Sequence, residues 1–184
     1  MLIVADIEQL PIEQARKGDP GAWDTLFRRY QMPLYVYAYE LSHDEQGSLD
    51  VVQETFVAAV RHLRTLRLDE KFGSWLFGIA RQKCVQRWRQ SRREAIAMET
   101  LTSEPVDTER GADEWLIRKE QEADFLQLLE QLPEPQREVL VLFFLEEFSL
   151  DEIARITSAQ PGTVKSRLHY AKKAMRQLLE NKPL

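Results

Sequence analysis

The sequence has few of the residues that build catalytic and metal sites. It contains one cysteine, Cys84, which excludes an internal disulfide and a cysteine-cluster zinc site. The three histidines (His43, His62 and His169) are scattered, without cysteine or acidic partners at ligand spacing. A glycine-rich phosphate loop and a nucleophile–base pair are also missing. We therefore expect no metal, no cofactor and no enzymatic activity.

Long apolar runs are absent as well. No stretch approaches the ~20 apolar residues that a membrane-spanning helix needs, so we expect no membrane insertion. The opening segment, MLIVADIEQLP, lacks the basic start and the apolar length of a secretory signal. Together with the single cysteine, this predicts a protein of the reducing cytoplasm.

The third absence is strand periodicity. No segment of useful length alternates apolar and polar residues, whereas apolar residues at steps of three and four recur along the chain. With 43% hydrophobic and 30% charged residues in 184, the composition suits real cores in one large or two small domains. We predict an all-α fold.

Charge is distributed unevenly around the net value of −5. From Arg61 to Arg93 there are ten basic residues against two acidic ones, and from Glu94 to Glu134 there are twelve acidic residues against three basic ones. The basic block and a second one near the C-terminus predict two DNA-facing modules separated by a piece that avoids DNA.

The C-terminal stretch from Ser149 to Glu180 has the pattern of a helix-turn-helix. Ser149 and Glu152 form a capping-box signature, and Pro161 suits the first turn of a second helix. That second helix has an apolar face, and its other face is basic, with no acidic residue from Pro161 to Gln177. A basic face alone is more typical of a solvated helix, but the cap, the turn and the unbroken positive stripe together favour DNA binding in the major groove.

The N-terminal half predicts further helices. Asp19 and Pro20 are an N-cap and first-turn pair, Pro33 should kink or interrupt the helix that they open, and Ser42 with Glu45 is a candidate capping box. A helix from about Ser48 to Leu63 has Asp50, Gln53 and Glu54 on its polar face.

A break at Arg67 to Lys71 precedes the helix FGSWLFGIARQKCVQRWRQSRR, which starts with aromatic residues and has a strongly basic flank. Such a flank suits a nucleic-acid backbone and exposed bases. We expect Trp75 and Trp88 to be core residues rather than base-stacking ones, and Cys84 to be an inert core thiol.

Periodicity fades after Glu94, where Thr, Ser, Pro, Asp and Glu accumulate. We predict two small helical domains, at residues 1–95 and 113–184, joined by a flexible acidic linker at 96–112. The nearly all-round apolar segment from Val139 to Leu145 is expected to be buried in the second domain.

These motifs together resemble a family. DVVQETF, FGSWLFGIAR, LPEPQREVLVLFFLEEFSLDEIA and GTVKSRL, in this order, are similar to the bacterial RNA polymerase sigma factors of the compact extracytoplasmic-function (ECF) type, which retain the second and fourth conserved regions. The likeness runs from about Gln9 to Leu179, apart from the linker. It implies a non-catalytic subunit that binds core RNA polymerase and directs promoter-specific initiation.

The resemblance also implies residue roles. Asp50, Gln53 and Glu54 would face the β′ clamp helices, and the surface from Leu140 to Glu147 would meet the tip of the β flap. Minus-ten DNA would contact the loop, the following aromatic and the basic helix: Arg64, Arg67, Lys71, Trp75, Arg81, Gln82, Gln86, Arg89 and Arg93. Minus-thirty-five DNA would contact Thr163, Lys165, Ser166, Arg167, Tyr170 and Lys173.

The sequence departs from the family pattern in a few places. Leu49 stands where an acidic residue often precedes Asp50, which reduces the negative charge offered to the clamp. We hypothesise that phosphorylation of Ser48 or Thr55 restores it. Gln82 and Gln86 replace the usual Asn and Asp, and Ser158 replaces a turn glycine.

Two other functions remain open. One is a free-standing helix-turn-helix regulator of duplex DNA, for which the basic helix starting at Phe72 would be unnecessary. The other is a sigma-like protein-interaction module, which would support no transcription. Beyond core polymerase and promoter DNA, an anti-sigma factor or a kinase is a candidate partner.

Overall fold

The computed structural model describes residues 10–99 and 128–180, with residues 94–99 described by their backbone only. Within these ranges every regular element is helical, which confirms the all-α prediction. The elements are α1 (Ile12–Arg16), α2 (Pro20–Ser42), α3 (Glu45–His62), the 3-10 turns η1 (Leu63–Thr65) and η2 (Asp69–Lys71), α4 (Phe72–Glu99), α6 (Glu134–Leu145), α7 (Leu150–Thr157) and α8 (Pro161–Glu180).

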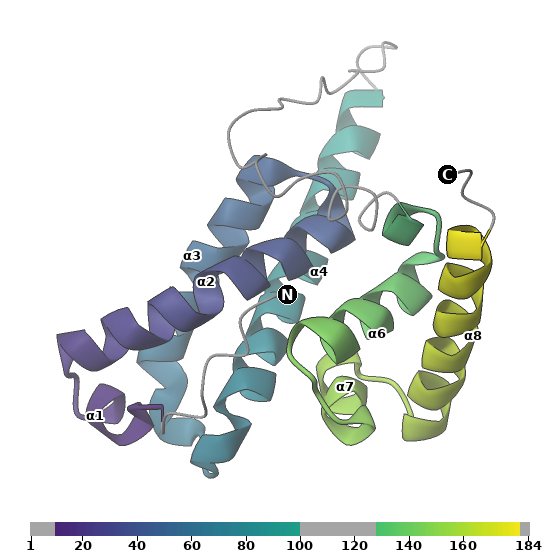
Figure 1. The fold of residues 1–184 in the computed structure, drawn as a ribbon. Helices are drawn as coiled ribbons and strands as arrows, with labels where there is room; N and C mark the ends of the chain where they lie inside the picture. Colours follow the sequence, from purple (N-terminus) through teal and green to yellow (C-terminus); the bar gives the residue numbers. More distant parts are fainter. Residues whose placement is uncertain (1–9, 100–127, 181–184) are drawn as a thin grey trace.

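The helices form an N-terminal unit, α1 to α4, and a C-terminal unit, α6 to α8, which lie against each other (Figure 1). In the N-terminal unit the long helices α2, α3 and α4 pack together. In the C-terminal unit α6 and α7 both contact α8. The two units meet where α7 packs on α4 and α6 packs on α2.

Local capping signals set several helix starts. The Asp19 carboxylate accepts a hydrogen bond from the Ala22 N–H at 2.8 Å, and Pro20 occupies the first helical position, as predicted. The predicted cap at Ser42 and Glu45 is wrong. Ser42 is the last residue of α2, and α3 is capped by Asp44, whose carboxylate accepts from the Gly47 N–H at 2.9 Å. An aspartate next to the helix start is an equally good cap and here stands closer to it.

Pro33 does not interrupt its helix, because α2 continues through it from Pro20 to Ser42. A proline inside a helix removes one backbone hydrogen bond. Its neighbours Tyr30, Leu34 and Tyr37 are buried on one face, so the packing of α2 offsets that loss.

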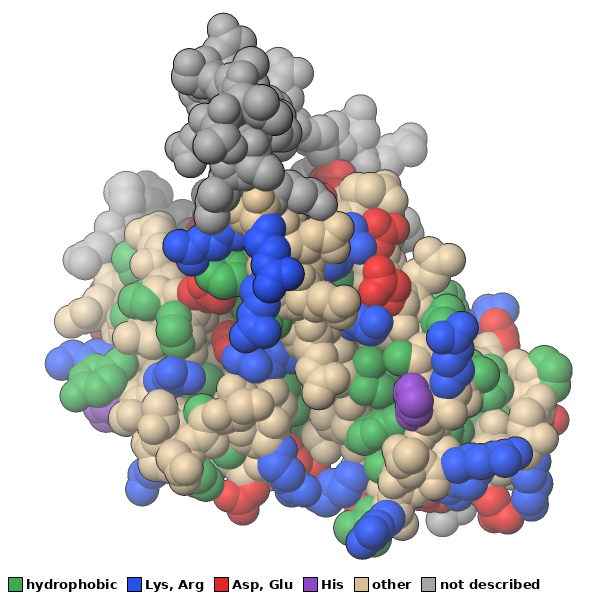
Figure 2. All heavy atoms as spheres, turned by 180° about the vertical axis from the view of Figure 1, so that it is seen from behind, with side chains coloured by type: hydrophobic (Ala, Val, Ile, Leu, Met, Phe, Trp, Pro, Cys, Tyr) green, Lys and Arg blue, Asp and Glu red, His purple; other side chains and the backbone are tan. Residues whose placement is uncertain are grey.

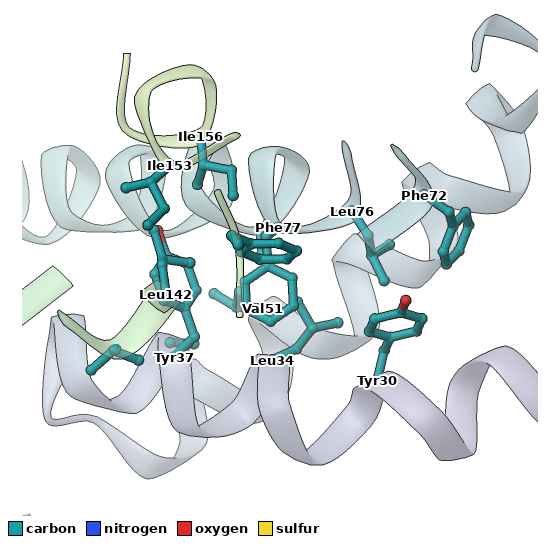
Figure 3. Packing of buried hydrophobic residues seen from close by; sticks show 14 of the residues in the cluster. Tyr30, Leu34, Tyr37, Val51, Phe72, Leu76, Phe77, Leu142, Ile153 and Ile156 are labelled. Atoms are coloured by element: carbon teal, nitrogen blue, oxygen red, sulfur yellow. The ribbon is translucent and has the colours of Figure 1, made fainter. Parts of the chain in front are cut away.

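One apolar cluster extends through both units (Figure 3). Phe77 of α4 is fully buried and its ring contacts Tyr37 of α2 at 5.3 Å and Phe148 of the C-terminal unit at 5.2 Å. Leu142, Ile153 and Ile156 lie beside these rings. The burial from Val139 to Leu142 agrees with the expected core segment, although Phe144 near its end is exposed.

The predicted linker lies largely outside the described residues. α4 extends to Glu99, past the predicted linker start at residue 96, and residues 100–112 are not described. Among the described helices, none is both long enough and apolar enough to span a membrane.

Candidate nucleic-acid and polymerase interface

The predicted polymerase-binding residues lie on the polar face of α3, next to the basic helix α4. Gln53 is exposed, while Asp50 and Glu54 are half-buried by ion pairs. The Arg87 guanidinium bridges them, 2.8 Å from the Asp50 carboxylate and 3.3 Å from that of Glu54, and Lys83 also pairs with Glu54 at 3.3 Å. The acidic surface predicted to bind polymerase is therefore partly neutralised from within the chain, by two cations of α4.

A groove of about 710 Å³ runs beside the start of α4. Its walls include Arg67, Lys71 and Trp75 of the predicted minus-ten surface, together with Gln82 further along the helix. Trp75 is half-buried and its ring packs against Phe72 at 5.8 Å, so one part of it is held by the core while another faces the groove. An aromatic wall with basic edges is the surface that single-stranded nucleic acid uses for stacking and backbone contacts.

A second hollow, of about 560 Å³, follows along the same helix. It is lined by Arg81, Gln82, Gln86, Arg89 and Arg93, so these residues of the predicted minus-ten set share one continuous face. Figure 2 shows Lys and Arg side chains gathered along this part of the molecule, below the grey residues. Arg64, by contrast, lies away from both hollows and lines a smaller cavity between α1 and α3.

Trp88 departs from the sequence prediction. Its side chain is 61% exposed, so the expectation that it belongs to the core is wrong. The Arg92 guanidinium lies over the indole ring, 5.4 Å from its centroid. The apolar stripe of α4 ends near Cys84, and Trp88 one turn later extends past the part of α4 that the other helices cover. Cys84 itself agrees with the expected inert thiol, because burial raises its pKa to about 12.

The C-terminal unit has the predicted helix-turn-helix geometry. The Ser149 hydroxyl accepts from the Glu152 N–H and the Glu152 carboxylate accepts from the Ser149 N–H, which confirms the capping box. α7 ends at Thr157, Ser158 has a left-handed backbone with φ 54°, and α8 begins at Pro161. Serine thus adopts the turn conformation for which glycine is usual.

The predicted minus-thirty-five residues lie on the outer side of α8. Its other side, with Val164, Leu168, Ala171 and Met175, is buried against α6 and α7. The exposed residues of the predicted set are Thr163, Lys165, Ser166, Tyr170 and Lys173, and Arg167 is half-buried. Lys165, Arg167 and Lys173 form no ion pair with any described residue, so their charges are available to a ligand.

Contacts between the two units involve acidic residues that the sequence analysis did not single out. The Glu138 carboxylate of α6 accepts hydrogen bonds from the Tyr37 hydroxyl at 2.9 Å and from the Arg81 guanidinium at 2.8 Å. Glu146 receives two hydrogen bonds of 3.0 Å from Arg29 of α2. These pairs join residues more than fifty positions apart, so no local pattern could have indicated them.

In two of the predicted ligand surfaces, a charged residue is already paired with a residue of the other unit. Lys71 of the minus-ten set pairs with Glu152 of α7 at 3.2 Å. On the surface predicted for the β flap, Leu140 is buried and the Glu146 carboxylate is taken up by Arg29, whereas Phe144 is exposed. The Lys172 ammonium lies 3.9 Å from the Phe143 ring centroid.

The hypothesised phosphorylation sites are both buried. Ser48 and Thr55 have no exposed surface, and the Ser48 hydroxyl donates to the Asp44 carbonyl at 2.6 Å. A kinase would first have to unfold part of α3 to reach either hydroxyl, so their burial is evidence against this hypothesis. Among the described residues no cluster of three or more His, Cys, Asp or Glu side chains is arranged to hold a metal.

Comparison with known proteins gives matches along both units. The family described as sigma-70 region 2 matches residues 26–94, and the family described as sigma-70 region 4 matches residues 122–175. The ECF RNA polymerase sigma-E factor of Escherichia coli is 34% identical over 178 residues, covering 91% of this chain and 92% of that protein. RNA polymerase sigma-H factor of Pseudomonas aeruginosa is 29% identical, covering 97% of each chain.

Two solved structures are similar as well. The sigma factor RpoE, in complex with the anti-sigma factor NepR from Bartonella quintana, superposes with a TM-score of 0.67 at 25% identity, covering 87% of this chain and 98% of that one. CnrH, in complex with the cytosolic domain of CnrY, gives a TM-score of 0.63 at 26% identity, covering 94% and 96%. Both structures extend over the N-terminal and C-terminal units.

Proposed function

Since this chain belongs to the ECF RNA polymerase sigma factors, which serve promoter-specific transcription initiation, we propose that it holds core polymerase through α3 and reads two promoter elements with α4 and α8. Two separate basic surfaces in one chain carry this proposal: a groove with an aromatic wall along α4, and the outer side of the second helix of a helix-turn-helix. A simple duplex-binding repressor needs only the second.

In the proposed polymerase contact, Asp50, Gln53 and Glu54 face the β′ clamp helices. Their position supports this role, because they form one polar stripe on α3. Binding to a basic clamp surface would exchange the internal pairs with Arg87 and Lys83 for external ones. The cations released from those pairs lie on α4, so core binding would add positive charge to the helix that meets DNA.

At the minus-ten element, the proposed task is to hold an opened strand rather than to perform chemistry. Unstacking a base costs a few kcal/mol, and base stacking on an aromatic side chain returns ~1–3 kcal/mol. Trp75, Arg67 and Lys71 would contact the displaced base. The DNA backbone would contact the polar face of α4: Gln82, Gln86, Arg89 and Arg93. Arg64 and Arg81 complete the proposed set. Binding energy alone then separates the strands, which fits the non-catalytic character of sigma factors.

At the minus-thirty-five element, α8 would lie in the major groove. The N-terminal part of a recognition helix is the part that reaches base edges. This favours Thr163, Lys165, Ser166 and Arg167 as base-reading residues, with Tyr170 and Lys173 nearer the phosphates. The division into a first domain at 1–95 and a second at 113–184 belongs to the same proposal, as does location in the cytoplasm, where polymerase works. An anti-sigma partner is proposed because the similar sigma factor RpoE is seen in complex with the anti-sigma factor NepR.

A direct test mixes the purified chain with core RNA polymerase of the same bacterium. We expect co-elution in gel filtration and a specific transcript from the promoter upstream of the chain's own operon. The double variant Asp50→Lys, Glu54→Lys should lose both results, because it presents like charge to a basic clamp. Asp24→Lys is the matched control, since Asp24 is an exposed acid on α2 that pairs only with Arg28. Wild-type chain that neither co-elutes nor supports a transcript would refute the proposal.

The free-standing regulator remains the second candidate, because the cations of α8 are unpaired among the described residues. It predicts protection of a specific duplex by the chain alone, with no increase when core polymerase is added. Protection that requires core polymerase would exclude it.

A further inference from the structure

A small cavity between α1 and α3 collects cations from two separate segments of the chain. Its volume is about 280 Å³, and four of the nine residues that line it are basic: Arg16, Lys17, Arg61 and Arg64. None of the nine is acidic. Cavities for drug-sized ligands begin at about 300 Å³, so this one suits a small anion better than a large organic molecule.

Half of this positive charge is not neutralised within the chain. Two of the four cations are paired with carboxylates at the rim of the cavity: Arg16 with Asp69, and Lys17 with Glu13. Arg61 and Arg64 are exposed, and neither has a carboxylate partner among the residues that the structure describes. The cavity therefore keeps two positive charges that no described side chain offsets.

The dipoles of the helices explain the individual cations but not their meeting. Arg16 and Arg61 each lie in the last turn of a helix, where a cation interacts favourably with the helix dipole. That effect gives no reason for two such helix ends to border one cavity, where their like charges repel each other. An anion in the cavity would remove this repulsion.

The uncharged wall of the cavity does not oppose an anion. The Ala15 carbonyl accepts hydrogen bonds from the Trp23 indole N–H at 3.0 Å and from the Gly18 N–H at 2.9 Å, so both of its lone pairs are used. Gly18 has a left-handed backbone with φ 88°, which glycine adopts without strain, and it lies in the turn between α1 and α2. This backbone acceptor of the wall is therefore already satisfied.

The cavity and the groove beside α4 lie on different sides of the end of α3. His62 and Leu66 line the groove, whereas the alternating residues Arg61, Leu63 and Arg64 line the cavity. An α-helix is ~10–12 Å across, which is about three stacked nucleotides at ~3.4 Å each. A strand that leaves the groove over this helix end would bring a phosphate to the cavity within that length.

We propose that the cavity between α1 and α3 is a phosphate-binding site, in which Arg61 and Arg64 hold the phosphate oxygens and Lys17 lies at the rim. A guanidinium suits this ligand, because its planar fork matches two phosphate oxygens at once. The phosphate can come from two sources, which are the opened strand where it continues past the groove, and a free phosphorylated small molecule. The first source rests on the proposed function of α4, and the second does not.

The Trp23 indole N–H is a direct reporter of this site, since it forms its hydrogen bond at the cavity wall. In a nitrogen–proton NMR spectrum of the full free chain, each of the four tryptophans gives one indole signal. The variants Trp23→Phe and Trp75→Phe identify the signals that report on the cavity and on the groove. Inorganic pyrophosphate is titrated first, and we expect the Trp23 signal to shift in a saturable way at concentrations that leave the Trp75 signal in place.

Reversing one charge of the cavity separates a built site from loose attraction. Arg61→Glu should weaken pyrophosphate binding by about tenfold or more, because it replaces a charge-assisted hydrogen bond by repulsion. Arg28→Glu is the matched control at an exposed position of α2 that pairs only with Asp24, and salt screening should keep its effect within about twofold. Arg61→Gln is the milder variant if Arg61→Glu does not melt cooperatively.

Two results would overturn the proposal. One is the lack of a saturable Trp23 shift with pyrophosphate in the wild-type chain. The other is equal weakening by Arg61→Glu and Arg28→Glu, which would mean that pyrophosphate is attracted by the overall charge and not held in the cavity.

Single-stranded oligonucleotides then distinguish the two sources of the phosphate. One oligonucleotide ends with the minus-ten sequence, and two others extend it by a few nucleotides at the 5′ or the 3′ end. A Trp23 shift that requires an extension identifies the strand as the source, and a shift with pyrophosphate but with none of the oligonucleotides identifies a free phosphorylated ligand. Both results support the site. Failure of the proposed function would appear separately, as a wild-type chain that supports no transcript with core polymerase, and would leave the pyrophosphate result unchanged.

Discussion

The helices α4 and α8 both carry a row of Lys and Arg side chains, but they differ in how many of these cations pair with carboxylates. On α4 and the turn before it, Lys71, Arg81, Lys83 and Arg87 are all paired with carboxylates. On α8, the cations Lys165, Arg167, Lys173 and Arg176 have no such partner among the residues that the structure describes. The first half of the basic stripe on α4 is therefore occupied, whereas Arg89, Arg92 and Arg93 in its second half, like the cations of α8, have no carboxylate partner among the described residues.

This difference shows that a count of basic residues does not give the charge available to DNA. The partners of Arg81 and Lys71 come from a unit that follows more than fifty residues later in the chain, and those of Lys83 and Arg87 come from the neighbouring helix α3. The comparison predicts that the free chain binds duplex DNA through α8 more readily than it binds an opened strand through α4.

The largest expected effect comes from truncating Phe77, the side chain of α4 whose ring contacts both α2 and the C-terminal unit. Phe77→Ala should lower the free energy of unfolding by about 3–5 kcal/mol, because a fully buried aromatic side chain leaves a cavity between Tyr37 and Phe148. Urea denaturation measures the change. Phe144→Ala is the control, since its 57% exposed ring should cost well under half as much. Equal losses for the two variants would mean that α4 does not join the units through its core.

The buried acid opposite the C-terminal unit should make stability depend on pH. Burial raises the pKa of Glu40 from 4.5 to about 7, against the attraction of Arg137 and with the added repulsion of Glu130. The folded state then binds more protons than the unfolded state between these values, so stability falls as pH rises from about 4.5 to 7. The full effect is on the order of 3 kcal/mol.

Replacing this acid isolates its contribution. Glu40→Gln should be more stable than wild type at pH 8, with the difference shrinking toward pH 5, as measured by thermal melting at each pH. Glu45→Gln, at an exposed position of α3, provides the control. A Glu40→Gln variant whose pH profile parallels that of wild type would show that Glu40 is not held in a buried, uncompensated state.

Whether the cations of α8 are more available to DNA than those of α4 can be tested with duplex DNA in the absence of polymerase. The double variant Lys165→Ala, Arg167→Ala should reduce the affinity of the free chain for a minus-thirty-five duplex by about thirtyfold or more, since each lost base contact is worth ~1–3 kcal/mol. The double variant Arg89→Ala, Arg93→Ala on α4 should change the same affinity by less than threefold. Fluorescence anisotropy at fixed salt measures both, and a stronger effect from α4 would reverse the comparison.

A smaller effect is expected at the cap of α7. Ser149→Ala should destabilise the chain by about 1 kcal/mol, because it removes the oxygen that accepts from the Glu152 N–H. Ser166→Ala on the exposed side of α8 is the control and should leave the melting temperature unchanged within error, while Ser149→Ala lowers it by a few degrees. An unchanged melting temperature for both would indicate that the cap contributes nothing to the C-terminal unit.

Features with a local cause were predictable from the sequence. Asp19, Ser149 and Pro161 mark helix starts through contacts within three or four residues, and all three agree with the structure. Gln82, Gln86, Arg89 and Arg93 follow one another at steps of three and four, which is the spacing of one helical face, and they line one hollow. Helical periodicity and capping act over single turns, so a sequence is enough to find them.

Features that depend on packing were not predictable in the same way. Pro33 is held inside α2 by buried neighbours, and Trp88 is exposed because no other helix among the described residues covers it. The pairing of Glu138, Glu146 and Glu152 with cations of the N-terminal unit depends on the contact between the two units, and no local pattern indicates it. Periodicity gives the face of a helix and leaves open which distant element will cover it.

The most direct measurement is of promoter opening itself. A promoter with a fluorescent base analogue in the minus-ten element is mixed with core polymerase alone, with this chain alone, and with both together. We predict a fluorescence rise only with both, and its loss when Trp75 is replaced by Ala. A rise with core polymerase alone, or none with both on a promoter that the chain's own cell transcribes, would contradict the assignment of promoter opening to this chain.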